Sequence, residues 1–374
     1  MKIGIITLPL HNNYGGILQA YALQKVLQNM GHDATVIDKS RIIKLSLVRR
    51  VYSYFRRFIK KVLIDKHTVI IWDKKHNTES NIMRMYTYPF LLKHIKRVEL
   101  IRDYSEIKEG EYQAFVVGSD QIWRPMQLGE SFIDKAFLSF TKEWDVKRVS
   151  YAASFGSDEW EYSIAQTINC GSLLKKFNAV SVREDSAVGL CKKHFGIDAL
   201  HVLDPTMLLS SDDYIRLFQY ANTPASTGTL MCYILDNNKD KENLICHIAN
   251  ELNLKAFAVN SKYEIPDAPI KERIQPPVEC WLRGFYDAEM VFTDSFHGCV
   301  FSIIFNKPFW VIENKERGNT RFDSLLRIFN LEDRKIDSSK ISNVDFTRPI
   351  DWALVNSIKK EWQEKSTNFL KENL

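Results

Sequence analysis

The chain has 374 residues, of which 45% are apolar and 26% charged, with 15 Gly and 11 Pro and a net charge of +5. These values are close to globular averages and exclude a disordered, collagenous or coiled-coil protein. Because the chain is about two to three times the usual length of a single domain, it predicts two packed domains.

Cysteine spacing and hydropathy limit the class of protein further. The six cysteines lie 14 to 41 residues apart along the chain and form no CxxC pair. Neither a zinc cluster nor a dense disulfide framework is therefore expected, and Cys299 is interpreted as a buried thiol. No apolar run reaches the roughly 18 residues of a spanning helix, and residues 3–6 are too short a run for a signal peptide. We expect a cytoplasmic protein.

The chain opens with a βαβ pattern. A β-branched run at residues 2–7 predicts a buried strand, residues 11–16 form a polar Gly-rich turn, and residues 17–27 carry an apolar helical pattern before a strand at 34–37. Later in this half, strands are predicted at 114–118, 148–151 and 179–182, and helices at 160–177 and 184–194.

One segment accounts for the basic charge. Residues 41–66 hold nine Lys or Arg against one acid, a net charge of +8, which leaves −3 for the remaining chain. Their apolar residues recur at three- and four-residue steps, so the segment predicts a basic amphipathic helix. It is interpreted either as a surface helix packed on its own domain or as a peripheral contact with an anionic membrane. Nucleic acid is not expected as a partner, because no binding motif accompanies the charge.

A second α/β series follows Asp204. Strands are predicted at 229–235, 255–259, 289–293 and 308–312, with helices at 239–252 and 296–305. The pattern indicates an α/β protein with two Rossmann-like domains. The expected domains are residues 1–205, with the basic insertion at 41–66, and residues 206–350, joined near residues 203–212. The last segment, 351–374, is expected to form a helix that returns to the first domain.

Open α/β sheets bind ligands at the carboxyl ends of their strands, so the loops that follow strands are the candidate site. The first carries Asn13, Tyr14, Gly15 and Gly16. The glycine pair at a helix N-terminus lets backbone N–H groups approach an oxygen-rich ligand, although a tight turn explains it about as well. The loop lacks both the dinucleotide fingerprint and the phosphate-binding loop.

The second loop carries Ser119, Asp120 and Trp123. Asp120 follows a predicted buried strand, where its carboxylate is either a helix cap or a general base for a substrate hydroxyl. Trp123 is a candidate apolar platform for a sugar ring.

The remaining two loops carry the candidate anion ligands. Arg183 comes directly after a predicted strand and suits carboxylate or phosphate binding, with an internal ion pair to Glu184 or Asp185 as the alternative. His297 lies at the start of a predicted helix, between the polar residues Asp294 and Ser295 and an apolar helical run. There it either faces an anionic ligand or is a hydrogen-bonded core histidine.

These loops together resemble the polysaccharide pyruvyl transferase family. The resemblance rests on the order of modest motifs along nearly the whole chain: Asn13-Tyr14-Gly15-Gly16, Gly118-Ser119-Asp120-Gln121-Ile122-Trp123, Tyr151-Ala152-Ala153-Ser154-Phe155-Gly156, Ser181-Val182-Arg183-Glu184, Asp204-Pro205-Thr206 and Thr293-Asp294-Ser295-Phe296-His297-Gly298. It implies a fold similar to GT-B glycosyltransferases. It also implies transfer of a pyruvyl group from phosphoenolpyruvate to two hydroxyls of a sugar in a surface polysaccharide or its precursor, forming a ketal.

By the same resemblance, an arginine at the position of Arg183 and a histidine at the position of His297 contact the donor. Family members often have Arg-Leu-His-Gly where this chain has Ser295-Phe296-His297-Gly298, so one arginine is missing. Lys315, Arg317 or Arg321 could supply the lost charge from the following segment.

The expected catalytic residues are His297 as the acid, Asp120 as a base and Arg183 as the group that neutralises anionic oxygens. No metal and no cofactor is expected; phosphoenolpyruvate is the donor substrate, and the saccharide acceptor is a candidate for lipid linkage. The alternative function is a GT-B glycosyltransferase with a nucleotide-sugar donor, since the same fold hosts both. Donor binding is assigned to Arg183, Ser295, His297, Gly298, Lys315 and Arg321, and acceptor binding to Asn13, Tyr14, Gly15, Gly16, Ser119, Asp120 and Trp123.

Overall fold

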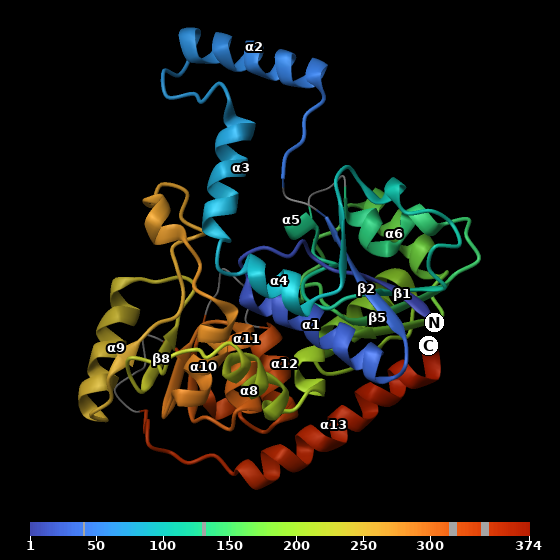
Figure 1. Ribbon diagram of the computed structural model, residues 1–374. Coiled ribbons are helices and arrows are strands. Elements are labelled where there is room, and N and C mark those ends of the chain that lie inside the picture. Colours follow the sequence, from blue (N-terminus) through green and yellow to red (C-terminus); the bar gives the residue numbers. More distant parts are fainter. Residues whose placement is uncertain (40–41, 129–131, 314–319, 338–343) are drawn as a thin grey trace.

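The computed structural model describes residues 1–39, 42–128, 132–313, 320–337 and 344–374. It contains two parallel β-sheets with helices packed around each (Figure 1). This confirms the predicted α/β class, with two Rossmann-like lobes and a C-terminal helix that returns to the first lobe.

The first sheet has seven parallel strands in the order β3-β2-β1-β4-β5-β6-β7. Its central strands are short, largely apolar runs that are almost wholly buried, as expected for strands covered on both faces. The strands are β1 (Lys2–Ile6), β2 (Asp33–Lys39), β3 (Arg97–Leu100), β4 (Ala114–Val117), β5 (Lys147–Ala153), β6 (Ala179–Val182) and β7 (Leu200–His201).

The helices of the first lobe start at recognisable caps. The Asn13 side chain accepts a hydrogen bond from the Gly16 N–H (3.0 Å) at the first turn of the helix that follows β1. Ser163 and Gln166 form a capping box that begins the helix expected at 160–177. The helices are α1 (Tyr14–Asn29), α4 (Tyr88–His94), α5 (Pro125–Leu128), α6 (Ile164–Leu174) and α7 (Asp185–Leu190).

The second sheet has five parallel strands in the order β12-β11-β10-β8-β9. Its strands are β8 (Leu230–Tyr233), β9 (Ala256–Phe257), β10 (Met290–Thr293), β11 (Phe309–Ile312) and β12 (Lys335–Ile336). Its helices are α8 (Ser211–Tyr220), α9 (Lys239–Glu251), α10 (Val278–Asp287), α11 (Phe296–Ile304) and α12 (Thr320–Ile328).

The last helix, α13 (Trp352–Asn373), runs back along both lobes to the first one (Figure 1). Its Ser366 hydroxyl accepts a hydrogen bond from the Leu203 N–H (3.0 Å), and the Phe369 ring lies 6.4 Å from that of Tyr151. One hydrophobic core continues from α1 through residues 202–209 to the helices of the second lobe and to α13. The lobes are therefore joined by a shared core rather than by a linker alone.

The basic segment forms α2 (Leu47–Leu63), which stands clear of both lobes on top of α3 (Trp72–Met83) (Figure 1). The expected amphipathic helix is thus present at residues 47–63. It contributes no buried residue, so the interpretation of a helix whose apolar face packs on its own domain is wrong.

Candidate active site

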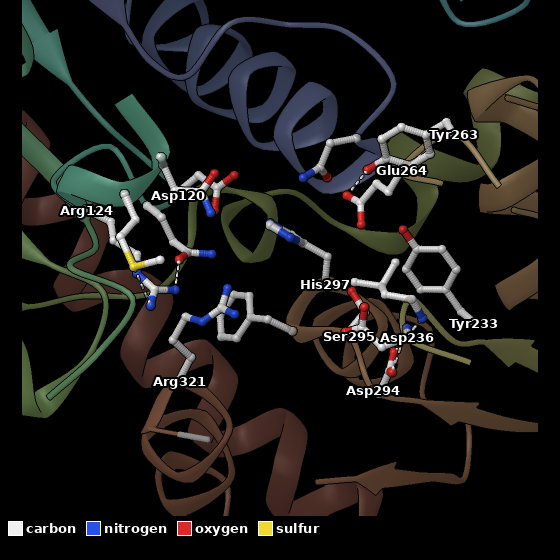
Figure 2. A pocket seen from close by; sticks show the side chains of 16 residues that line it. Asp120, Arg124, Tyr233, Asp236, Tyr263, Glu264, Asp294, Ser295, His297 and Arg321 are labelled. Carbon is white, nitrogen blue, oxygen red and sulfur yellow. Dashed lines mark hydrogen bonds between the residues drawn. The ribbon is translucent and has the colours of Figure 1, made fainter. Parts of the chain in front are cut away.

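A pocket of about 340 Å³ lies where the carboxyl ends of the strands of the two sheets face each other. Figure 2 shows His297 near its centre, with Arg124, Arg321 and Asp120 on one side and Tyr233, Tyr263, Asp236 and Glu264 on the other. Its lining comes from the loops after β1, β4, β8, β9 and β10 and from α12. Open α/β sheets bind ligands at the carboxyl ends of their strands, so this pocket lies where a ligand is expected.

His297 reaches the pocket because the turn after β10 is held by side chains. The Thr293 hydroxyl donates to the Tyr233 carbonyl (2.7 Å) and accepts from the Ser295 N–H (3.0 Å). Ser295 then caps α11, its hydroxyl accepting from the Gly298 N–H. His297 therefore sits in the first turn of α11, where the helix dipole favours an anion.

The imidazole of His297 lies directly against Gly15 of the other lobe. A Cβ at position 15 would stand only 2.0 Å from the His297 Nδ1 atom, so no side chain fits there without moving the ring. The glycine was interpreted as a ligand contact or a tight turn. The structure gives it a different role, which is to admit the histidine of the second lobe.

Arg183 is the centre of a buried charge network beneath the pocket. Its Nη1 donates to Asp204 Oδ2 (2.8 Å), its Nε donates to Glu184 Oε1 (3.1 Å), and its Nη2 lies 3.6 Å from Asp120 Oδ1. Burial would lower the pKa of Arg183, but the three carboxylates raise it above its ordinary value. The guanidinium therefore stays charged.

The expectation that Arg183 faces the donor is not met in this structure. Its side chain is 1% exposed and is absent from the pocket lining. The internal ion pair with Glu184, which was the alternative interpretation, is present. Three carboxylates surround the guanidinium, because the strand order β4-β5-β6-β7 brings the ends of distant strands together.

Asp204 links this network to the catalytic candidate. Its Oδ2 lies 3.7 Å from the His297 Nε2 atom, and within the described ranges that nitrogen has no hydrogen-bond partner. Burial alone would raise the pKa of Asp204, but His297, Arg183 and the Thr206 hydroxyl hold it well below its usual range. A buried carboxylate held by other groups therefore lies beside the nearer nitrogen of the imidazole.

Asp120 stands at the junction of two cavities. It lines the first pocket and also a second one of about 400 Å³ that runs past Asn13 and Gly16 toward α3. The backbone at Asp120 has a φ of +62°, an uncommon conformation for a residue other than glycine. Such outliers concentrate at functional sites.

The cationic side of the pocket is built by arginines. Arg321, on α12, has its guanidinium carbon 5.9 Å from the centroid of the Phe296 ring. Burial and the charge of Arg183 lower the pKa of Arg321 to about 10, so it remains charged at neutral pH. Arg124 lies nearby but is held by Glu161, to which its Nη2 donates (2.9 Å).

Three residues assigned to the acceptor are buried elsewhere. Trp123 is fully buried, stacks on Phe137 at 4.9 Å and donates to the Ala136 carbonyl, so its assignment as a sugar platform is wrong. Ser119 is buried and donates to Asp204 (3.1 Å). Tyr14 is buried against Trp281 and donates to the Pro276 carbonyl.

Of the other assigned residues, some line one of the two pockets and others allow the close packing around them. Asn13 and Ser295 line the first pocket, and Gly16 lines the second. Gly298 is buried, and a Cβ there would stand 2.1 Å from the Thr293 hydroxyl oxygen, so it allows close packing of α11 on β10. Lys315 lies outside the described residues, as does Arg317.

The sequence reasoning missed the polar side of the pocket opposite Arg321. Tyr233, Asp236, Tyr263 and Glu264 line it. Asp236 closely follows β8, so the rule of strand carboxyl ends could have found it. Tyr263 and Glu264 follow the short strand β9 in an irregular segment, and no local pattern marks them.

A family model for polysaccharide pyruvyl transferases matches residues 13–316. The chain belongs to the polysaccharide pyruvyl transferase family. The match includes both lobes and every named pocket residue except Arg321. No curated protein matches the chain. For this pyruvyl transferase family member, every helix within the described ranges is too short or too polar to cross a bilayer.

Solved structures that are similar to this family member have low sequence identity to it. UDP-GlcNAc 2-epimerase from Methanocaldococcus jannaschii is 12% identical over 98% of this chain and 99% of its own, with a TM-score of 0.49. The Arabidopsis thaliana enzyme UGT89C1 complexed with UDP-L-rhamnose is 9% identical over 98% and 97%, with a TM-score of 0.48. These likenesses concern the course of the chain and not its substrates.

Proposed function

We propose that this protein transfers a pyruvyl group from phosphoenolpyruvate to two hydroxyls of a saccharide, in a surface polysaccharide or its precursor, and forms a cyclic ketal. The observation that carries the proposal is the position of His297 in a pocket between the lobes, with Arg321 beside it and Asp120 facing it. Membership of the family supports the reaction class.

The donor carries a carboxylate and a phosphate, so it needs a cationic pocket. Arg321 lines the pocket, whereas Arg183 is enclosed by carboxylates below it. This supports Arg321 as the side chain that replaces the arginine missing at Ser295. The first turn of α11 adds backbone N–H groups whose dipoles favour the same anion.

The reaction balances with one acid and one base. His297 gives a proton to the methylene carbon of the donor, which becomes a methyl group and leaves an oxocarbenium-like centre on the neighbouring carbon. The oxygen of one sugar hydroxyl bonds to that carbon and releases its proton. The bond from the carbon to the phosphate oxygen then breaks, and the second hydroxyl adds to give the ketal and free phosphate. One released proton restores His297, and the other leaves with phosphate.

Asp120 is proposed as the base for the sugar hydroxyls. It lines both cavities, so an acceptor in the second cavity would meet a donor in the first at this carboxylate. Arg183 then acts as a positioning residue, because it contacts both Asp120 and Asp204. By holding the Asp204 carboxylate in place, it maintains the charged group that lies beside His297. Its charge also helps to lower the pKa of Asp204.

Donor binding can be tested by calorimetry with the full chain, phosphoenolpyruvate and UDP-glucose as separate probes. We expect phosphoenolpyruvate to bind, and Arg321→Ala to weaken it by roughly tenfold or more, the loss of about one charge-assisted hydrogen bond. Arg327→Ala is the matched control, since this exposed arginine lies on the same helix and pairs with Asp185. Binding of UDP-glucose with no response to phosphoenolpyruvate would instead establish the nucleotide-sugar alternative.

Turnover can be tested with oligosaccharides released from the cell surface of the producing strain, by measuring phosphate release and the added mass of the ketal. His297→Ala should lower the rate by about 10²- to 10⁴-fold, the usual contribution of a general acid, with an unchanged melting temperature. His247→Ala, at an exposed position on α9, should leave the rate as it is. Near-normal turnover in His297→Ala would exclude the proposed acid.

A further inference from the structure

The helix α2 separates charge from apolar surface almost completely. It contains six Lys or Arg and no acid. At about 100° per residue, its ten apolar and aromatic residues fall on one half of the helix and its basic residues on the other. A helix of this kind in a folded protein ordinarily turns the apolar half toward the core.

In this protein α2 turns its polar side, and not its apolar half, toward the rest of the chain. Its polar half contacts α3 together with Tyr54, which lies at the margin of the apolar half. Tyr54 donates to Asp73 (2.8 Å), Ser53 accepts from the Trp72 ring N–H (3.2 Å), and the Arg57 guanidinium stacks over Trp72. The apolar half points away from the protein. Exposed fractions there are 75% for Leu47, 80% for Val48, 62% for Val51, 64% for Phe55, 52% for Phe58, 61% for Val62 and 75% for Leu63.

The charge pattern identifies what covers this face. A second copy would bring six like charges against six, which opposes pairing of the two helices. An anionic bilayer attracts the same charges and accepts the apolar side chains between its headgroups. A 17-residue helix with six charges is unsuited to spanning the bilayer, which needs about 20 apolar residues, so it would lie in the plane of the surface.

We propose that α2 is an in-plane anchor that binds anionic membrane surfaces through residues 47–63. Arg49, Arg56 and Lys60 are exposed and lie toward the border of the apolar half, where they can reach lipid phosphates while the aromatic rings insert. The proposed contact with the membrane does not depend on which chemical group is transferred in the pocket.

The anchor is joined to both lobes by α3. Ser80 of α3 is hydrogen-bonded to His11 of the first lobe (2.7 Å), and the Met83 carbonyl accepts from the Gln275 N–H of the second (2.9 Å). The twelve residues of α3 span about 18 Å at 1.5 Å per residue. His76, Ser80 and Met83 also line the second cavity. If the proposed function holds, the cavity opens toward a membrane-borne acceptor, which indicates a saccharide on a lipid carrier.

The test is co-sedimentation of the full chain with vesicles of phosphatidylcholine alone and of phosphatidylcholine with phosphatidylglycerol. We expect binding only to the anionic vesicles, weakened by added salt. Arg56→Gln with Lys60→Gln should weaken binding by roughly 25-fold, since each charge near the surface contributes about a factor of five. Phe55→Ser with Phe58→Ser should weaken it by roughly a hundredfold.

Matched controls lie on other exposed helices. Ile164→Ser with Ile168→Ser removes two apolar side chains that are 83% and 70% exposed on α6, and should leave vesicle binding unchanged. The α2 variants should keep the melting temperature and the turnover of a short water-soluble acceptor. Equal binding by wild type and the Phe55/Phe58 variant, or a lowered melting temperature of that variant, would overturn the anchor. A concentration-dependent dimer that this variant abolishes would overturn it in favour of a contact between copies.

Discussion

The contact between Gly15 and His297 offers the sharpest test of how the two lobes build one site. Gly15 belongs to α1 in the first lobe, and His297 to α11 in the second. A methyl group at position 15 would lie 2.0 Å from Nδ1, 2.3 Å from Cγ and 2.6 Å from Cε1 of the imidazole. Ordinary carbon contacts begin at 3.4 Å, so Gly15→Ala must push the ring by more than 1 Å.

The expected change in the unfolding free energy of Gly15→Ala is the balance of two opposing effects. Alanine is favoured over glycine inside a helix by up to about 1 kcal/mol, whereas overpacking a filled site costs about 1–3 kcal/mol. We expect Gly15→Ala to lose up to about 2 kcal/mol of unfolding free energy. Turnover should fall by about a hundredfold, because a displacement of about 1 Å in a reacting group has this effect.

The neighbouring glycine provides the control. A Cβ at Gly16 would lie 3.6 Å from its nearest atom, on Asn13, which is an ordinary contact. Gly16→Ala should therefore keep the stability or raise it slightly, and should leave the proton donor in place. Urea unfolding and phosphate release from phosphoenolpyruvate measure the two properties on the same samples.

A double-mutant cycle separates the contact from other effects. In a His297→Ala background the ring is gone, so Gly15→Ala should no longer destabilise, and the coupling energy should be about 1–3 kcal/mol. The reasoning is refuted if Gly15→Ala retains wild-type turnover, or if its stability cost is the same with and without the imidazole.

Two further predictions concern the buried charges below the pocket. Arg183→Met leaves three carboxylates without their cation and should lower the unfolding free energy by about 3–5 kcal/mol in a urea titration. The control is Arg216→Met, which breaks an exposed ion pair with Asp213 and should lower the unfolding free energy by at most about 1 kcal/mol. Asp204 has a lowered pKa in the folded state, so its stabilisation is complete above its unfolded pKa of about 4 and is lost as the pH falls below it. The fall in stability between about pH 4 and pH 2 should be shallower in Asp204→Asn, and an identical slope would contradict the pairing.

The sequence predicted the central strands, most of the helices next to them and several of the loops that line the candidate pocket, because these depend on local patterns. β6 was expected at residues 179–182 and is found there, and α11 differs from its prediction by one residue. The edge strands β3, β7 and β12 were missed. They have two to four residues and are partly exposed, so they carry too little apolar periodicity to be distinguished from loops.

The contacts of each site residue could not be predicted in the same way. Arg183 and Asp204 are 21 residues apart and meet only because β6 and β7 are neighbours in the sheet. Trp123 is buried because Phe137, at the end of the short 3-10 helix Ile133–Phe137, stacks on it. The amphipathic pattern of α2 was visible from its spacing, but the outward direction of its apolar half is set by Trp72 and Asp73 on α3.

His297, the proposed proton donor, and Asp204 lie on opposite lobes, and this placement has a mechanical consequence. His297 comes from the second lobe, while Gly15, which admits it, and Asp204, which lies beside it, come from the first. A shift of one lobe against the other would separate the imidazole from this carboxylate. The Tyr14 hydroxyl bond to Pro276 and the core shared with α13 oppose such a shift. The returning helix α13 therefore helps to keep the two lobes of the candidate pocket in place without lining it.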